Sequence, residues 1–190
     1  CYAAFVQAAL TGKSIYVPAG TYYVSGAIQL RNQKLFGDGM FQSYIVSTAS
    51  DTSVPVLYLG RSCAVEDINI GFDPSLITGN ETAGERAGII TGDNYTPPWP
   101  LQRGSQINRV HIANTGTAIY SPQSGTEEAT SFSVAYTNLE LQDFSFRGID
   151  FVSKTRTGNV FSNIYMRSDH IVDSLFNMEG EESETTIIQL

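Results

Sequence analysis

A short apolar segment recurs in the sequence at a nearly constant interval. Ile89, Ile119 and Ile149 lie 30 residues apart in three copies, and a fourth copy at residues 174–177 follows after 26. The copies read Gly-Ile-Ile-Thr, Ala-Ile-Tyr-Ser, Gly-Ile-Asp-Phe and Ser-Leu-Phe-Asn. An internal repeat of this period is typical of a chain that stacks similar units on one another.

A second apolar pattern lies between the copies of the first. Its spacing is apolar-x-x-apolar-x-apolar, and it occurs at Val65/Ile68/Ile70, Ile107/Val110/Ile112, Leu141/Phe144/Phe146 and Phe161/Ile164/Met166. Another short apolar run, residues 56–59, precedes the first of these. Each unit therefore combines a small apolar strand, a loop and a longer alternating strand over about 20 to 40 residues.

These units contain too few apolar residues to bury themselves, so each must stack on its neighbour. A repeat made of strands alone predicts an all-β fold, the parallel β-helix, with rungs about 4.8 Å apart. The alternation then places two columns in the interior: Ile68, Val110, Phe144 and Ile164, and Ile70, Ile112, Phe146 and Met166. An antiparallel sandwich of about seven strands is the alternative, but it would not need a long-period repeat.

The start of the chain predicts a short helix followed by strands. Residues 2–10 are apolar at helical spacing and end before Thr11-Gly12. Short β-rich runs between turn residues follow, as in residues 15–22 (Ile-Tyr-Val-Pro-Ala-Gly-Thr-Tyr), 28–30 and 35–39 (Leu-Phe-Gly-Asp-Gly). The helix should cover the open end of the stack, because uncovered strand edges favour aggregation, and the side chains expected to do so are Phe5, Val6, Ala9 and Leu10.

This opening resembles the entry of the pectate-lyase-type right-handed parallel β-helix superfamily. The resemblance is strongest over residues 5–39. In the rest of the chain it consists of the general pattern of the repeat. It implies a helical cap at residues 1–12 and β-helix coils over residues 13–190. Because residues 185–190 read as an apolar strand without a polar cap, we expect the β-helix to continue beyond Leu190 or to stack on a partner.

The resemblance also implies function. The branch of the superfamily that the sequence most resembles includes phage tailspikes and preneck appendages, exo-acting glucanases and related polysaccharide-cleaving enzymes. It predicts recognition of a polysaccharide or cell-surface glycan in a virion tail or an extracellular setting, with a homotrimer as one assembly, and any cleavage would be by a lyase or a glycoside hydrolase. A cellular extracellular lyase or hydrolase and a non-catalytic structural rod are the alternatives.

Composition excludes several other classes. Nineteen acidic against 11 basic residues give a formal charge of −8, which argues against a nucleic-acid partner. No apolar run approaches the roughly 18 to 20 residues of a membrane span. Two cysteines, Cys1 and Cys63, and two widely spaced histidines support neither a disulfide framework nor a zinc finger, although one bridge between the cysteines stays open. No metal or cofactor is expected.

The same alternation assigns two outward columns: Asp67, Arg109, Asp143 and Asn163, and Asn69, His111, Ser145 and Tyr165. In β-helix polysaccharide enzymes the chemistry takes place on such an outer face, where a lyase needs a base and a cation and a hydrolase needs two carboxylates. Asp67, Asp143 and His111 are therefore the catalytic candidates. Two rungs would separate the aspartates by about 10 Å. An exposed ladder of ordinary ion pairs is the alternative interpretation.

An insertion at residues 91–100 contains the only tryptophan and three of the seven prolines. Prolines stiffen a loop, and a rigid tyrosine or tryptophan offers a flat apolar face to a sugar ring. We therefore expect a glycan to contact Arg109 and Tyr165, with Tyr95 and Trp99 in one wall of the site. The acidic balance favours a neutral or sparsely charged glycan. The alternative is that Trp99 packs back on the coil.

Overall fold

A computed structural model describes residues 1–91, 101–122, 130–152, 155–179, 181–183 and 186–188. This part of the chain folds into one α-helix, one 3-10 helix and a series of mostly short strands. Their bounds are α1 Tyr2–Leu10, β1 Ile15–Val17, β2 Gly20–Val24, β3 Ile28–Leu30, β4 Lys34–Gly37, β5 Ser43–Ser47, β6 Leu57–Leu59, β7 Ala64–Phe72, η1 Pro74–Leu76, β8 Ile89–Thr91, β9 Leu101–Arg103, β10 Gln106–Ser121, β11 Thr130–Phe132, β12 Ala135–Phe151, β13 Thr155–Thr157, β14 Val160–Arg167, β15 Ser174–Met178, β16 Glu181–Ser183 and β17 Thr186–Ile188.

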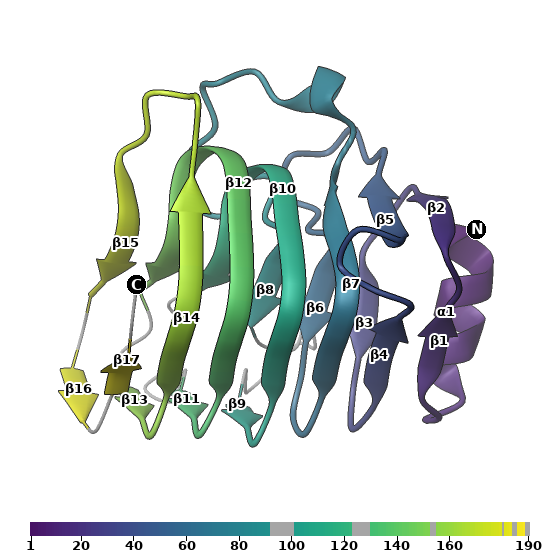
Figure 1. The fold of residues 1–190 in the computed structure, drawn as a ribbon, viewed down its shortest axis with the longest axis horizontal. Helices are drawn as coiled ribbons and strands as arrows, with labels where there is room; N and C mark the ends of the chain where they lie inside the picture. Colours follow the sequence, from purple (N-terminus) through teal and green to yellow (C-terminus); the bar gives the residue numbers. More distant parts are fainter. Residues whose placement is uncertain (92–100, 123–129, 153–154, 180, 184–185, 189–190) are drawn as a thin grey trace.

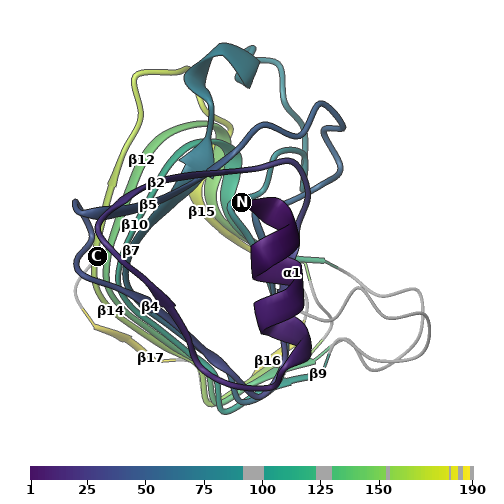
Figure 2. The same ribbon diagram turned by 90° about the vertical axis from the view of Figure 1, so that its right-hand side faces the viewer.

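The strands stack in parallel into a right-handed β-helix, which confirms the fold expected from the repeat and from the resemblance (Figure 1). One face runs through the order β1-β4-β7-β10-β12-β14-β17, and β2, β3, β5, β6, β8 and β15 extend the same sheet around the coil. A second sheet has the order β16-β13-β11-β9. Seen end-on, successive coils superpose around a common interior, and α1 lies across one end (Figure 2).

The interior columns agree with the prediction in β7, β10 and β14 and differ in β12. The first column is continued in β12 by Leu139, and the second by Leu141. The predicted positions of Phe144 and Phe146 in these columns are therefore wrong. The corrected columns are Ile68, Val110, Leu139 and Ile164, and Ile70, Ile112, Leu141 and Met166.

The error arose because the apolar pattern occurs twice in β12. Its first occurrence begins at Tyr136, and its second, five residues later, uses Phe144. The structure uses the first: Tyr136 is fully buried and stacks on Phe161, with ring centroids 4.7 Å apart and planes 6° apart. Phe144 is also fully buried, but it lies opposite Thr115 after the next bend, while Phe146 is only partly buried.

A left-handed backbone residue explains why two residues separate the first two inward positions of the pattern. Asp67, Arg109, Asn138 and Asn163 occupy equivalent places in β7, β10, β12 and β14, and each has a φ of 53° or 54°. Aspartate and asparagine tolerate this conformation better than other non-glycine residues. The strand turns a corner at this residue, so one additional residue fits between two inward side chains.

The 30-residue repeat corresponds to direct strand pairing. Ile119 of β10 pairs with Ile89 of β8 on one side and with Ile149 of β12 on the other. In the fourth copy the partner of Ile149 is Phe176, so this copy is offset by one residue from the predicted Leu175.

Each copy of this repeat begins with a small residue, and this residue faces the interior. A Cβ added at Gly148 would lie 2.8 Å from the sulfur of Met166 and 3.2 Å from the ring of Phe144. A Cβ at Gly88 would lie 2.6 Å from Ile112 Cγ2. The interior at this point is already filled from the opposite wall, which explains the small residue there.

Helix α1 covers the end of the stack through part of its predicted apolar set. Phe5 is buried and packs edge-on against Tyr22 with centroids 6.2 Å apart, whereas Val6 and Ala9 are half-buried. Leu10 is 76% exposed, so the prediction that it helps to cover the open end of the stack is wrong. The helix ends at Leu10, and its last residue lies beyond the edge of the core.

Other sequence-based expectations are also resolved. The structure contains no disulfide between Cys1, which is exposed, and Cys63, which is buried in the core. Among the described residues, no helix has the length and apolar character that crossing a membrane requires.

A long connection between β7 and β8 packs over the coil. Its Glu81 is 7% exposed and accepts hydrogen bonds from the backbone N–H groups of Thr78 (2.7 Å) and Gly79 (3.0 Å). The Ser145 hydroxyl of β12 donates to the same carboxylate. Although burial opposes it, this set of donors lowers the pKa of Glu81 to about 2. The carboxylate thus fastens the loop to a strand two coils away.

Candidate functional site

The corner residues form a charged ridge along the coil. Arg109 donates from Nε and Nη2 to the two carboxylate oxygens of Asp67, at 2.6 and 2.8 Å. These bonds hold the pKa of Asp67 below its usual value. Glu66, beside it, pairs with Lys34 at 2.7 Å. The arginine predicted to contact a ligand is therefore already neutralised by its neighbour, although its side chain remains 48% exposed.

The predicted catalytic aspartates do not share a column. Asp143 is equivalent to Asn114 at the next corner of the coil, and both residues have positive φ, 50° and 52°. Asp67 instead stacks with Arg109 at the first corner. The predicted two-rung separation of Asp67 and Asp143 along one column is wrong, because it rested on the misplaced register of β12.

Between these two corners lies a short flat face with one row of outward side chains. The backbone register places Asn69, His111, Glu140 and Tyr165 side by side on successive strands. We call these four residues the outer row. Glu140 takes the place predicted for Ser145, which instead contacts Glu81 beyond the second corner. The predicted neighbours Asn69, His111 and Tyr165 are thus confirmed in position.

His111 is held tightly within the outer row. The amide of Asn69 contacts its Nδ1, and both side chains are only 8% exposed although they point away from the interior. Burial lowers the pKa of His111, while Glu140, Gln142 and Asp143 oppose this shift. At neutral pH the ring is therefore uncharged and acts as a hydrogen-bonding group.

The residue that covers His111 is Phe41, which the sequence analysis did not identify. The two ring centroids are 5.2 Å apart, and the planes are inclined by 50°. Phe41 lies in the turn between β4 and β5, where the Tyr44 hydroxyl donates to its carbonyl oxygen at 2.8 Å. The Phe41 side chain remains 57% exposed. Phe41 therefore presents an exposed apolar ring that packs on His111.

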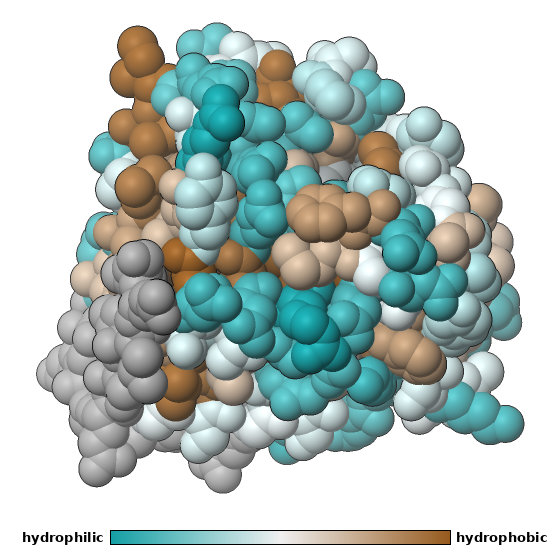
Figure 3. Space-filling view, in the orientation of Figure 1, coloured by the Kyte–Doolittle hydropathy of each residue, from teal (hydrophilic) through white to brown (hydrophobic). Residues whose placement is uncertain are grey.

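Tyr165 provides a second aromatic surface at the other end of the outer row and is 55% exposed. It lies two strands from His111, or roughly 10 Å by rung spacing. The polar group between them is Glu140, whose carboxylate accepts a hydrogen bond from Gln142 at 2.5 Å. Figure 3 shows this side of the molecule, where hydrophilic and hydrophobic patches alternate over β7, β10, β12 and β14.

The predicted wall of the site, Tyr95 and Trp99, lies outside the described residues. The strands that flank this insertion are β8 and β9. In the end-on view β9 lies at the lower right, whereas β7 and β10 are labelled on the left (Figure 2). Strand β9, which follows the insertion, therefore lies on a different side of the coil from the outer row, and the contribution of Tyr95 and Trp99 to the site stays a prediction.

Chemically, the face offers hydrogen-bonding groups and aromatic surfaces. Its carboxylates are Glu140, hydrogen-bonded by Gln142, and Asp143 at the second corner, whose charge also acts on Arg167. Among the side chains that the structure describes, no group of three or more histidine, cysteine, aspartate or glutamate residues could hold a metal ion. The catalytic roles of Asp67, Asp143 and His111 stay predictions.

Comparisons with known proteins give two distant structural likenesses. One is a mutant pectin methylesterase in complex with a hexasaccharide, with a TM-score of 0.49, 10% identity, and coverage of 93% of this chain and 57% of that one. The other is the Agl-KA catalytic domain, with a TM-score of 0.38, 14% identity, and coverage of 98% and 44%. The chain thus spans about half the length of either structure. No family model and no curated protein matches it, and these likenesses assign it to no family.

Proposed function

We propose that the chain binds a polysaccharide across the outer row. The observation that supports this most is the pair of half-exposed aromatic side chains, Phe41 and Tyr165, on either side of the polar Glu140. Carbohydrate rings present apolar faces and hydroxyl edges, so a surface that alternates aromatic and hydrogen-bonding groups suits them. The parallel strands fix the spacing of His111, Glu140 and Tyr165 before a ligand arrives, and Phe41 packs on His111, which limits the entropy lost on binding.

The charges support a neutral or sparsely charged glycan. Arg109 is neutralised by Asp67, and His111 is uncharged at neutral pH because burial lowers its pKa. Glu140 and Asp143 leave the rest of the face acidic, and the chain as a whole has a formal charge of −8. A polyanion would be repelled from such a face.

In a tailspike-like or appendage-like β-helix, this surface would recognise a bacterial surface glycan, and we propose that role for the chain. An extracellular lyase or hydrolase would use the same face, with Glu140 or Asp143 beside the bound chain as acid or base. A structural rod would leave it without a ligand. The three roles differ in what they do to a polysaccharide, and this can be measured.

The test is binding of a panel of neutral and acidic surface polysaccharides to the wild-type chain and to Tyr165→Ala. Tyr23→Ala is a matched control, because Tyr23 is also 56% exposed but lies in β2, at the far end of the stack. We expect binding of a neutral glycan that Tyr165→Ala weakens about tenfold or more and Tyr23→Ala leaves unchanged. New reducing ends would indicate a hydrolase, and an unsaturated, ultraviolet-absorbing product a lyase. Equal binding by all three proteins would contradict the proposed site.

A further inference from the structure

The outer row also constrains the direction in which a bound glycan can lie. Its four residues belong to the neighbouring strands β7, β10, β12 and β14, which pair in parallel and in register at these positions. Figure 1 shows these strands side by side along the stack. The outer row therefore runs parallel to the axis of the coil, with one residue for each rung and about 4.8 Å between rungs.

Along the strands, in contrast, the same face is short. In β12 it extends from the first corner at Asn138 to the second corner at Asp143, which have positive φ angles of 53° and 50°. Only Glu140 and Gln142 point outward between these corners, because the residues that alternate with them are buried in the interior. A glycan laid along a strand would soon cross a corner, whereas a glycan laid along the axis meets the same face at every rung.

Exposed aromatic rings lie at every second rung of this axial path. Phe41 lies over His111 at the rung of β10, Glu140 follows in β12, and Tyr165 lies at the rung of β14. The two aromatic surfaces are thus two rungs apart, or roughly 10 Å. Their exposed fractions are nearly equal, 57% for Phe41 and 55% for Tyr165. A chain that uses both rings must present an apolar face at every second sugar.

Polar side chains lie along both edges of the path. On the side of the first corner, the exposed Asn163 donates a hydrogen bond to the exposed Asn138 at 2.8 Å. On the other side, Gln142 and Arg167 lie opposite each other in the register of β12 and β14, and the Arg167 side chain is 60% exposed. Both edges therefore offer hydrogen-bonding groups to the hydroxyl groups of a sugar chain.

This distribution matches a flat, ribbon-like glycan. Where the two bonds that link each pyranose ring are equatorial and lie at opposite ends of the ring, the chain is extended and each sugar is turned over relative to its neighbour. Sugars two positions apart then present the same face. The faces of such a ribbon carry C–H groups, and its edges carry hydroxyl groups, so rings suit the faces and polar side chains suit the edges. A chain with an axial linkage curves, and its successive sugars leave a straight row.

We propose that the outer row binds an extended, equatorially linked neutral glycan that lies parallel to the axis of the coil, with one sugar at each rung. Alternate sugars stack on Phe41 and Tyr165, and a hydroxyl group of the sugar between them donates to Glu140. This binding mode rests on the glycan-binding function proposed above and adds the class of linkage and the direction of the chain. A ligand needs at least three sugars to contact both aromatic rings.

The test compares short oligosaccharides that differ in linkage and in length. Cellotriose and chitotriose are β-1,4-linked and extended, whereas maltotriose is an α-1,4-linked isomer of cellotriose and is curved. The side-chain resonances of Phe41 and Tyr165 are followed by NMR while each sugar is added to about millimolar concentration. We expect at least one extended trisaccharide to shift both rings and to bind about tenfold more tightly than maltotriose and than its own disaccharide.

A pair of variants relates the length dependence to the second ring. Tyr165→Ala should remove the advantage of the extended trisaccharide over its disaccharide, whereas the matched control Tyr23→Ala should keep it. Equal binding of extended and curved trisaccharides would overturn the proposal, as would an affinity that does not increase from the disaccharide to the trisaccharide, or the absence of shifts in Phe41 and Tyr165 with both extended probes. The proposed function fails separately, if no polysaccharide of the panel shows binding that depends on Tyr165.

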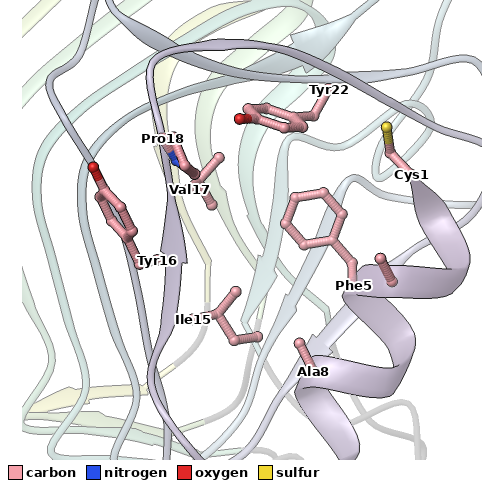
Figure 4. Close-up of a pocket in the computed structure, with 9 residues that line it drawn as sticks. Cys1, Phe5, Ala8, Ile15, Tyr16, Val17, Pro18 and Tyr22 are labelled. Carbon is pink, nitrogen blue, oxygen red and sulfur yellow. The ribbon is translucent and has the colours of Figure 1, made fainter.

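A second place where a small ligand could lodge provides an internal reference. Phe5 and Tyr22 line an apolar hollow between α1 and β1, at the helix-covered end of the stack (Figure 4). We expect the resonances of these two rings to stay unchanged with every sugar. Shifts confined to Phe5 and Tyr22 would show that the sugars bind in this hollow and would also overturn the proposal.

Discussion

The phenyl ring of Phe41 lies over the imidazole of His111, with ring centroids 5.2 Å apart. These residues are 70 positions apart in the chain, and stacking of the coils alone brings them together. The contact explains how a histidine on the outward side of a strand is only 8% exposed. Through this contact the buried imidazole of His111 lies directly beside the exposed apolar ring of Phe41.

The first prediction concerns the protonation of His111. Burial lowers its pKa, so removing the cover in Phe41→Ala should raise that pKa toward the ordinary value of about 6.5. The unfolded chain binds this proton more readily than the folded one, so the stability associated with His111 is complete above about pH 6.5 and declines as the pH falls below it. Titration of the imidazole resonances by NMR measures the shift, with the exposed His170 as internal reference. An unchanged pKa for His111 would show that Phe41 does not shield it.

The second prediction concerns the register of β12. If Tyr136 stacks on Phe161 as the structure shows, a double-mutant cycle with Tyr136→Leu and Phe161→Leu should give a coupling of about 0.5 to 1.5 kcal/mol in denaturant unfolding. Tyr136→Leu combined with Phe5→Leu, at the far end of the stack, is the control and should be additive. Additivity in both cycles would indicate that the strands pair in another register.

Much of the fold could be predicted from the sequence, because each coil of the stack needs apolar side chains at equivalent positions. The spacing of Ile89, Ile119 and Ile149 reflects strand pairing directly. The register of β12 could not be predicted, because its apolar pattern occurs twice and each occurrence has a left-handed residue at the same place, Asn138 in the first and Asp143 in the second. Apolar residues therefore identify the fold more securely than they identify the register.

The candidate site was only partly predictable for a related reason. His111 and Tyr165 were found because they alternate with core residues in their own strands. Phe41 lies in a turn that has no alternation, so nothing local connects it with His111. Asp143 was placed in the same column as Asp67 by the same register error, and this error also concealed that Glu140 is the neighbour of His111. The one signal available was the pair of large apolar residues, Met40 and Phe41, directly after Gly37-Asp38-Gly39.

The third prediction concerns acid stability. The pKa of Glu81 is about 2 in the folded chain against 4.5 for an ordinary glutamate, so its carboxylate favours folding above about pH 4.5 and this contribution is lost as the pH falls toward 2. Glu81→Gln should reduce stability at pH 7 and flatten its dependence on pH in this range. Denaturant unfolding at several pH values measures both effects. Glu85→Gln is the comparison: Glu85 lies in the same loop and its pKa is also lowered, by hydrogen bonds from Thr82 and Thr52, but it makes no hydrogen bond to β12, so we expect a smaller effect. A steep acid dependence that survives Glu81→Gln would assign it to other carboxylates.

The fourth prediction concerns the charge of Arg109 at the first corner of the coil and its effect on glycan binding. The Asp67–Arg109 pair is partly exposed, so Asp67→Asn should cost no more than about 1 kcal/mol and less at high salt. The same change removes the closer of the two carboxylates that pair with Arg109 and leaves Glu66, at 3.8 Å, and we expect it to increase affinity for acidic polysaccharides relative to neutral ones. Affinities measured for one neutral and one acidic glycan test this, and an unchanged ratio would show that Arg109 does not face the ligand.

The most direct test of the proposed function is the position of a bound glycan. Side-chain NMR of the chain labelled at histidine, phenylalanine and tyrosine, with and without a saturating neutral glycan, reports contact at each ring separately. We predict that the resonances of Phe41, His111 and Tyr165 shift together, while those of Phe5 and Tyr23 stay unchanged. Binding that leaves Phe41, His111 and Tyr165 unaffected and shifts other rings would contradict the assignment of the outer row as the glycan site.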